Sequence, residues 1–150
     1  MASIEKFAAR KVHHYYWDLD INCASTMLNI LSEIFSVDVN SQVLDAAVGM
    51  HGAGEFGAQC GLVEGSLMFL GIIGREKSMP DEAIIRICRD FAERFEHRFG
   101  SLRCSVLRPE GFKPENPPHL CEPLTRNAVL FSIDYISGIL AQSRKSAADR

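Results

Sequence analysis

Nearly every segment of the chain repeats its apolar residues with the period of an α-helix, and this pattern constrains the fold most. The breaks between segments fall at glycine, proline or asparagine, which end or cap helices. The length of 150 residues, 47% of them hydrophobic, suits one globular domain with a real core. We therefore predict an all-α fold, a single-domain orthogonal or irregular bundle of about six helices over residues 1–150.

One of the predicted helices is apolar nearly all round, which places it at the centre of the bundle. It runs from Cys60 to about Ile73 and follows a glycine-rich loop at 49–57. The proline-rich segment 108–123 cannot be regular helix, because proline lacks the amide proton. The polar tail 144–150 is predicted to fray. The expected helices cover residues 4–18, 22–35, 41–48, 60–73, 80–99 and 125–143.

Charge and hydropathy argue against two classes of partner. A net charge of -3 and a pI near 5.9 give no basic surface for nucleic acid. The longest apolar stretch, between Glu64 and Arg75, is too short to span a bilayer, and the N-terminus lacks an apolar signal core. We expect a cytoplasmic protein with no membrane insertion.

Two of the five cysteines are predicted at helix starts. Asn22 is a good helix cap, which puts Cys23 in the first turn, and Cys60 opens the apolar helix. Unpaired amides and the positive end of a helix dipole stabilise a thiolate, the form that reacts or binds metal. An odd number of cysteines, with no Cys-x-x-Cys motif, favours metal binding, redox chemistry or packing over a disulfide framework.

Four of the cysteines lie in a recognisable arrangement of short motifs. The sequence reads NCAS at 22–25, CGLVEG at 60–65, GSLRC at 100–104 and LC at 120–121. From about residue 8 to about 140 the chain resembles the C_GCAxxG_C_C family of redox-active proteins. Leu62 replaces the alanine of the family's CGAxxG motif, and Cys88 lies outside the pattern.

The resemblance implies redox activity and a prosthetic group. Soft thiolate sulfur suits an iron-sulfur cluster or another thiolate-ligated metal, and four sulfurs complete such a site. We expect electron transfer with an unknown redox partner protein rather than a stand-alone enzyme. The expected ligands are Cys23, Cys60, Cys104 and Cys121. Histidine can replace cysteine on a cluster iron, which makes His119 a spare ligand, but we expect it to be a solvent-exposed loop residue.

The glycines before and inside the CGLVEG motif have two interpretations. Residues 52–57 match the dinucleotide fingerprint G-x-G-x-x-G, but that motif works only between a strand and a helix of a parallel sheet. We expect instead that small residues let the backbone approach the cofactor or a facing helix, with amides aimed at sulfur. The residues concerned are Gly52, Gly54, Gly57 and Gly61.

Two other functions remain open from the sequence. The first is a metal-free dithiol protein, with Cys60 as the low-pKa attacking thiol. The second is a non-redox helical interaction module in which the thiols merely pack, since cysteine is among the most buried residue types. The aromatic run Tyr15-Tyr16-Trp17 on a small, apolar chain also suggests a homodimer.

Overall fold

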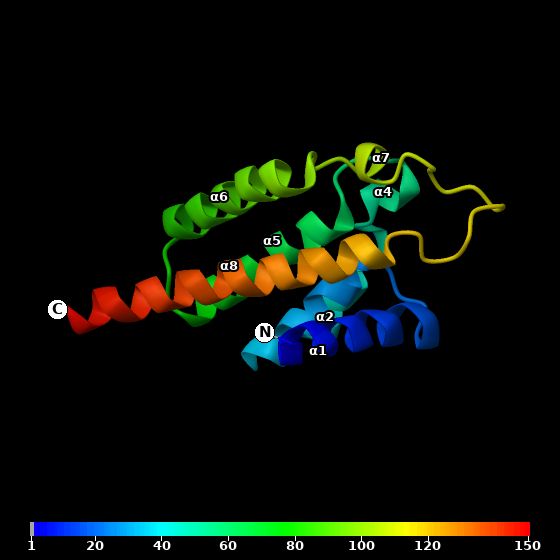
Figure 1. Cartoon of the computed structure of the whole chain (residues 1–150). Coiled ribbons are helices and arrows are strands. Elements are labelled where there is room, and N and C mark those ends of the chain that lie inside the picture. The colour runs from blue at the N-terminus through cyan, green and yellow to red at the C-terminus, as the bar shows by residue number, and fades with distance from the viewer. Residues whose placement is uncertain (1) are drawn as a thin grey trace.

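The computed structural model describes residues 2–150 and confirms the all-helical fold (Figure 1). Within that range no strand forms, and one isolated bridge joins Gln59 to Arg103. Six helices have six residues or more, as the sequence predicted. They are α1 (Ala2–His13), α2 (Cys23–Phe35), α3 (Ser41–Ala46), α5 (Gly61–Glu76), α6 (Asp81–Phe99) and α8 (Glu122–Ala148). Two further helices, α4 (Gly52–Glu55) and α7 (Cys104–Leu107), are one turn long.

Helix α5 forms the centre of the bundle and packs against α2, α6 and α8. Its apolar side chains Leu62, Phe69 and Leu70 are fully buried. A Cβ atom on Gly65 would lie 2.5 Å from the carbonyl oxygen of Ala24, so only glycine lets the backbones of α5 and α2 meet this closely. The apolar character of this segment therefore reflects its central position.

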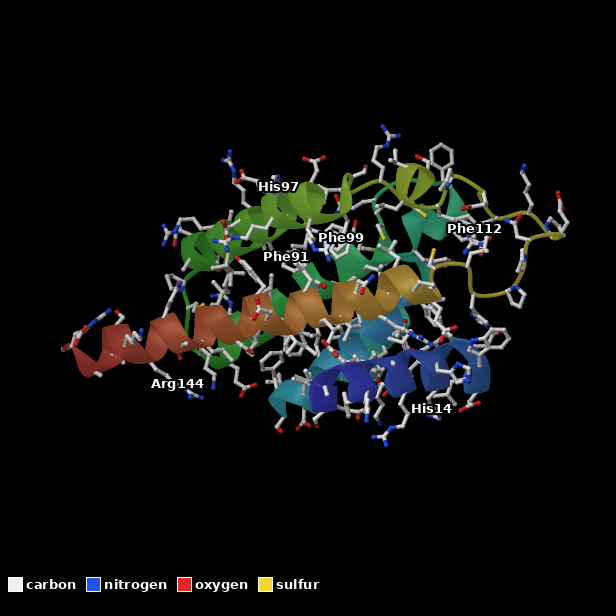
Figure 2. All side chains as sticks on the ribbon, in the orientation of Figure 1. His14, Phe91, His97, Phe99, Phe112 and Arg144 are labelled. Atoms are coloured by element: carbon white, nitrogen blue, oxygen red, sulfur yellow. The ribbon has the colours of Figure 1, made fainter. Side chains whose placement is uncertain are left out.

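An aromatic cluster joins α6 to α8. Figure 2 shows Phe91 and Phe99 between these two helices. The Phe91 and Phe99 rings meet Phe131 of α8 edge-on, at centroid distances of 5.4 and 5.6 Å. Cys88 is only half-buried at the edge of this core, with its sulfur 4.0 Å from the carbonyl oxygen of Leu67.

Helix boundaries differ from the predictions in two informative places. The first predicted helix ends in a π-helical turn, η1 (His14–Asp18), which turns Tyr16 into the core. The Tyr16 hydroxyl lies 2.6 Å from the Thr125 hydroxyl, so a tertiary contact accompanies the change of helix type. At the other end, α8 continues to Ala148 because its exposed last turns contain good helix formers and no breaker.

The remaining boundaries lie close to the predictions. The third predicted helix ends as a 3-10 turn, η2 (Ala47–Gly49), and the glycine-rich loop contains α4. Among residues 2–150, no helix has both the length and the hydropathy needed to cross a membrane.

Candidate functional site: a pocket lined by four cysteines

Four cysteines that are distant in sequence line one pocket of about 550 Å³. Each stands where a helix begins. Cys23 and Cys104 are the first residues of α2 and α7, and Cys60 and Cys121 directly precede α5 and α8. The sequence had identified two of these helix starts. Cys88, which lies outside the family pattern, is not part of the pocket lining.

A short backbone pairing holds Cys60 and Cys104 next to each other. The Cys60 amide donates to the carbonyl oxygen of Leu102 at 2.8 Å, and the Cys104 amide donates to that of Ala58 at 2.7 Å. The bridge between Gln59 and Arg103 lies between these two bonds. The segment before α5 and the segment before α7 therefore form one rigid wall.

Three of the four predicted glycines allow close approaches in or beside this site. A Cβ atom on Gly61 would lie 2.3 Å from the sulfur of Cys23, and one on Gly52 would lie 3.1 Å from the sulfur of Cys104. A Cβ atom on Gly57 would meet Ser105 at 3.1 Å. A Cβ atom on Gly54 would have nothing within 4 Å, so this position favours glycine only for its positive φ angle.

Helix α4 is a left-handed turn. All four of its residues have positive φ angles, namely 67° at Gly52, 54° at Ala53, 63° at Gly54 and 70° at Glu55. L-residues with a side chain lose about 1–2 kcal/mol each in this conformation. A bond from the Glu55 amide to the carbonyl oxygen of His51, at 3.0 Å, holds the turn, and both side chains reach the pocket wall.

Burial raises the pKa of three of the pocket thiols, Cys23, Cys60 and Cys104, and so favours their protonated form. Burial raises the pKa of Cys60 to about 11, although hydrogen bonds from the backbone of Leu62 and Val63 lower it. Burial, reinforced by Cys60, raises the pKa of Cys23 well above its ordinary value, and burial raises that of Cys104 as well. The predicted low pKa of Cys60 is therefore wrong, because desolvation outweighs the favourable helix start.

The rest of the pocket wall combines residues that the sequence analysis had noted with others, His51, Arg108 and Phe112, that it had not singled out. It includes the side chains of Tyr16, Asn22, His51, Leu62, Arg108, Phe112 and His119. The Arg108 guanidinium lies 4.2 Å from the centre of the Phe112 ring, and its Nε donates to the carbonyl oxygen of Gly111 at 2.7 Å. One of its terminal nitrogens lies 3.9 Å from the Cys121 sulfur. Only the folded chain brings the proline-rich loop to the cysteines.

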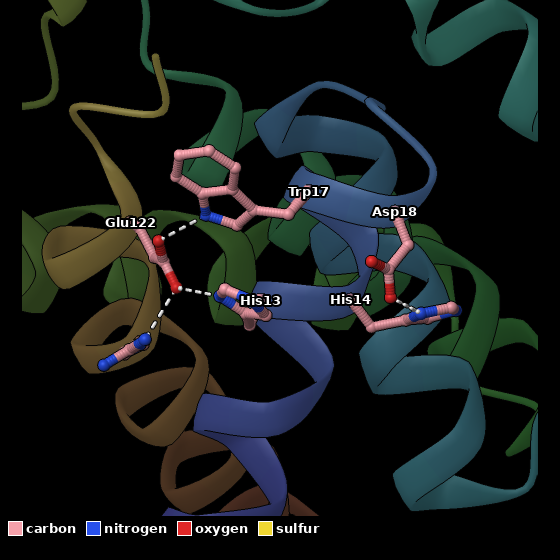
Figure 3. A network of polar contacts seen from close by, with 6 residues as sticks. His13, His14, Trp17, Asp18 and Glu122 are labelled. Carbon is pink, nitrogen blue, oxygen red and sulfur yellow. Dashed lines mark hydrogen bonds and ion pairs between the residues drawn. The ribbon is translucent and has the colours of Figure 1, made fainter. Parts of the chain in front are cut away.

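Glu122, next to Cys121, fastens the start of α8 to the end of α1 (Figure 3). Its carboxylate accepts from Trp17 Nε1 at 2.8 Å and from Arg126 at 2.6 Å, and lies 3.2 Å from His13 Nδ1. Burial opposes ionisation, but these three partners together lower the pKa of Glu122. Since Cys121 precedes this residue, the network fixes one corner of the pocket.

The four thiols do not form a ready-made site for a single ion. Within the described range 2–150, no group of three or more His, Cys, Asp or Glu side chains is arranged to hold one metal ion. A mononuclear centre requires metal–sulfur bonds of about 2.3 Å to all ligands, whereas a multinuclear centre accepts wider spacing. The sulfurs share a pocket without converging on one point.

Comparison with known families agrees with this arrangement. The profile of the family described as "Putative redox-active protein (C_GCAxxG_C_C)" matches residues 21–134. The chain belongs to the C_GCAxxG_C_C family. The matched region contains all four pocket cysteines, and the family description supports redox activity. No curated protein and no solved structure matches the chain.

Proposed function

We propose that this protein binds an iron-sulfur cluster, or another multinuclear thiolate-ligated metal centre, in the cysteine pocket and transfers electrons to a partner protein. The observation that carries the proposal is that four thiols from four helix starts line one pocket, while Cys88 does not. If the cysteines only packed in the core, nothing would require these four to line the same pocket while Cys88 lies elsewhere. The proposed setting is the cytoplasm, where thiols are kept reduced.

The donor set fits the group chemically. Cys23, Cys60, Cys104 and Cys121 would hold the centre, and soft sulfur donors favour iron-sulfur chemistry. When bound, the centre would supply one-electron transfer. Backbone hydrogen bonds to Cys60 from Leu62 and Val63 are of the kind that tunes the potential of such centres. Because metal binds thiolate, loading would displace the protons that burial retains on the thiols.

Metal analysis of anaerobically purified protein tests the proposal. We expect iron, together with acid-labile sulfide for a cluster, and visible absorption in the isolated or the reconstituted protein. Cys60→Ser and Cys104→Ser should lose most of the metal, whereas Cys88→Ser should retain it. A colourless protein with neither iron nor zinc after reconstitution, or equal loss in Cys88→Ser, contradicts the proposal.

A metal-free dithiol mechanism is a second candidate, favoured by one contact. The Cys23 sulfur lies against the backbone of Gly61, the residue that follows Cys60, and Cys60 contributes to the raised pKa of Cys23. Trapping of free thiols across a series of redox buffers distinguishes this mechanism. Reversible oxidation of Cys23 with Cys60 near a cytosolic potential supports it, and the absence of any such pair rejects it.

A further inference from the structure

The cysteines occupy only part of the pocket wall, and the remainder is built for a ligand. The cavity of about 550 Å³ falls in the usual range of small-molecule sites. Its other walls combine aromatic faces, Tyr16 and Phe112, with a few convergent polar groups, Asn22, His51 and Arg108. This combination is typical of a site that orients a small polar molecule.

Arg108 is the group in this wall that most restricts the chemistry of the ligand. Of the described residues lining the pocket, it alone has a permanently positive side chain. The bond from Nε to the Gly111 carbonyl oxygen and the stacking on Phe112 fix the plane of the guanidinium. Within residues 2–150, no carboxylate lies within 4.0 Å of it. Its terminal nitrogens are thus oriented but lack a counter-ion.

The two acids of the pocket do not neutralise Arg108, because each faces a histidine. Glu55 lies 3.7 Å from His51 Nε2, and Asp20 lies 3.9 Å from His119 Nε2. Their side chains are 55% and 91% exposed, so solvent screens their charges from Arg108. Arg108 is therefore left without a direct acidic partner in the pocket.

We propose that the pocket has a subsite for a small oxyanion, which Arg108 binds through its guanidinium beside the cysteines. Planar carboxylates and tetrahedral oxyanions both accept paired hydrogen bonds from a guanidinium. The 3.9 Å distance from Arg108 to the Cys121 sulfur places such an anion next to the proposed redox centre. This proposal rests on the proposed function, because a position next to the cysteines matters for redox chemistry only if they hold a redox centre. It names small oxyanions as the class of molecule on which that centre would act.

Titration of the metal-free protein with sodium acetate and, separately, with sodium sulfate tests the subsite. In ¹H–¹⁵N NMR spectra we expect saturable shifts of the Arg108 Nε and Gly111 signals with at least one of the two anions, and the stronger binder identifies the shape preferred. Arg108→Gln should weaken binding about tenfold or more, because it removes a charge-assisted pair of hydrogen bonds. Arg108→Lys, which keeps the charge but loses the fork, should bind with intermediate affinity.

Arg89→Gln is the matched control, since it removes the same charge from an exposed site on α6 and should bind as the wild type does. Absence of saturable shifts with both anions, or wild-type binding by Arg108→Gln, overturns the inference. The experiment separates the two proposals because it needs no metal. A protein that binds metal without binding either anion refutes the subsite alone, and one that binds an anion but never metal refutes the metal centre alone.

Discussion

At the scale of single residues, the tightest contact of the site joins a glycine to a thiol. Gly61 occupies an ordinary helical position, so its backbone does not require glycine. The requirement comes from the Cys23 sulfur, 2.3 Å from where a Cβ atom would be. One added methyl group at position 61 would therefore clash with the Cys23 sulfur, although the backbone there is ordinary helix.

Gly61→Ala is therefore expected to push the Cys23 thiol out of the pocket and to destabilise the protein. Overpacking of this kind costs about 1–3 kcal/mol, measured as the free energy of unfolding in urea. Under the proposed function, the variant should also lose metal.

Gly71→Ala is the matched control in the same helix, because nothing lies within 4 Å of its Cβ position. It should stabilise the protein by about 0.5–1 kcal/mol through helix propensity. If both variants show the same change in the free energy of unfolding, the contact with Cys23 is not what restricts position 61 to glycine.

At the scale of elements, the left-handed turn α4 has a strained backbone and forms part of the pocket wall. It holds Gly52 against the Cys104 side chain and brings His51 and Glu55 to the pocket wall. Gly52 needs glycine for both its φ angle and its contact, whereas Gly54 needs it for its φ angle alone.

Comparing Gly52→Ala with Gly54→Ala separates these two requirements. We expect a loss of about 1–2 kcal/mol at position 54 from the left-handed conformation. The loss at position 52 should be larger by about 1 kcal/mol or more, since Cys104 must also shift. Thermal unfolding of both variants measures the difference, and equal losses show that the contact with Cys104 can relax freely.

The junction of α1 with α8 depends on the carboxylate of Glu122. Glu122→Gln should destabilise the protein by about 1–3 kcal/mol at pH 7, because a partly buried acceptor of several bonds loses its charge. Glu93→Gln, which changes an exposed pair with Arg89, should cost at most about 0.5 kcal/mol.

The pH dependence of this effect has a defined sign. The pKa of Glu122 is lower in the folded protein than in the unfolded chain. Its stabilisation is therefore present above the unfolded pKa and is lost as pH falls through the folded one. Unfolding free energies of wild type and Glu122→Gln should converge in acid, and a constant gap down to pH 3 excludes an ionic role.

At the scale of the whole molecule, we expect the buried thiols to make the protein less stable at alkaline pH. The folded pKa of Cys60, about 11, exceeds the unfolded value, so its contribution is complete below the unfolded pKa and is lost as pH rises toward 11. For the metal-free protein we expect the free energy of unfolding to fall by about 1 kcal/mol per pH unit per thiol above roughly pH 8.5.

Urea unfolding between pH 7 and 10 checks this, with Cys60→Ala measured alongside. The slope against pH should be shallower in the variant. An identical slope shows that ionisation of Cys60 is not linked to folding.

The sequence predicted the helices well because they depend on local patterns, whereas the pocket depends on tertiary packing. Apolar periodicity located α2, α5 and α6 to within a few residues. No local signal marked the π-helical turn at 14–18 or brought Arg108 to the cysteines, since both depend on contacts with distant segments. The low pKa predicted for Cys60 considered the helix start alone and missed the burial that the assembled bundle imposes.

The way in which α8 is held has a consequence for the intact polypeptide. One loop, residues 108–121, connects α8 to the preceding part of the chain, while α8 also packs against α1, α2, α5 and α6. Protease cleavage at the exposed peptide beside Lys113 should therefore leave two fragments that stay associated without a covalent link. Cys121 would then stay in the same pocket as Cys23 and Cys60, held there by the packing of α8.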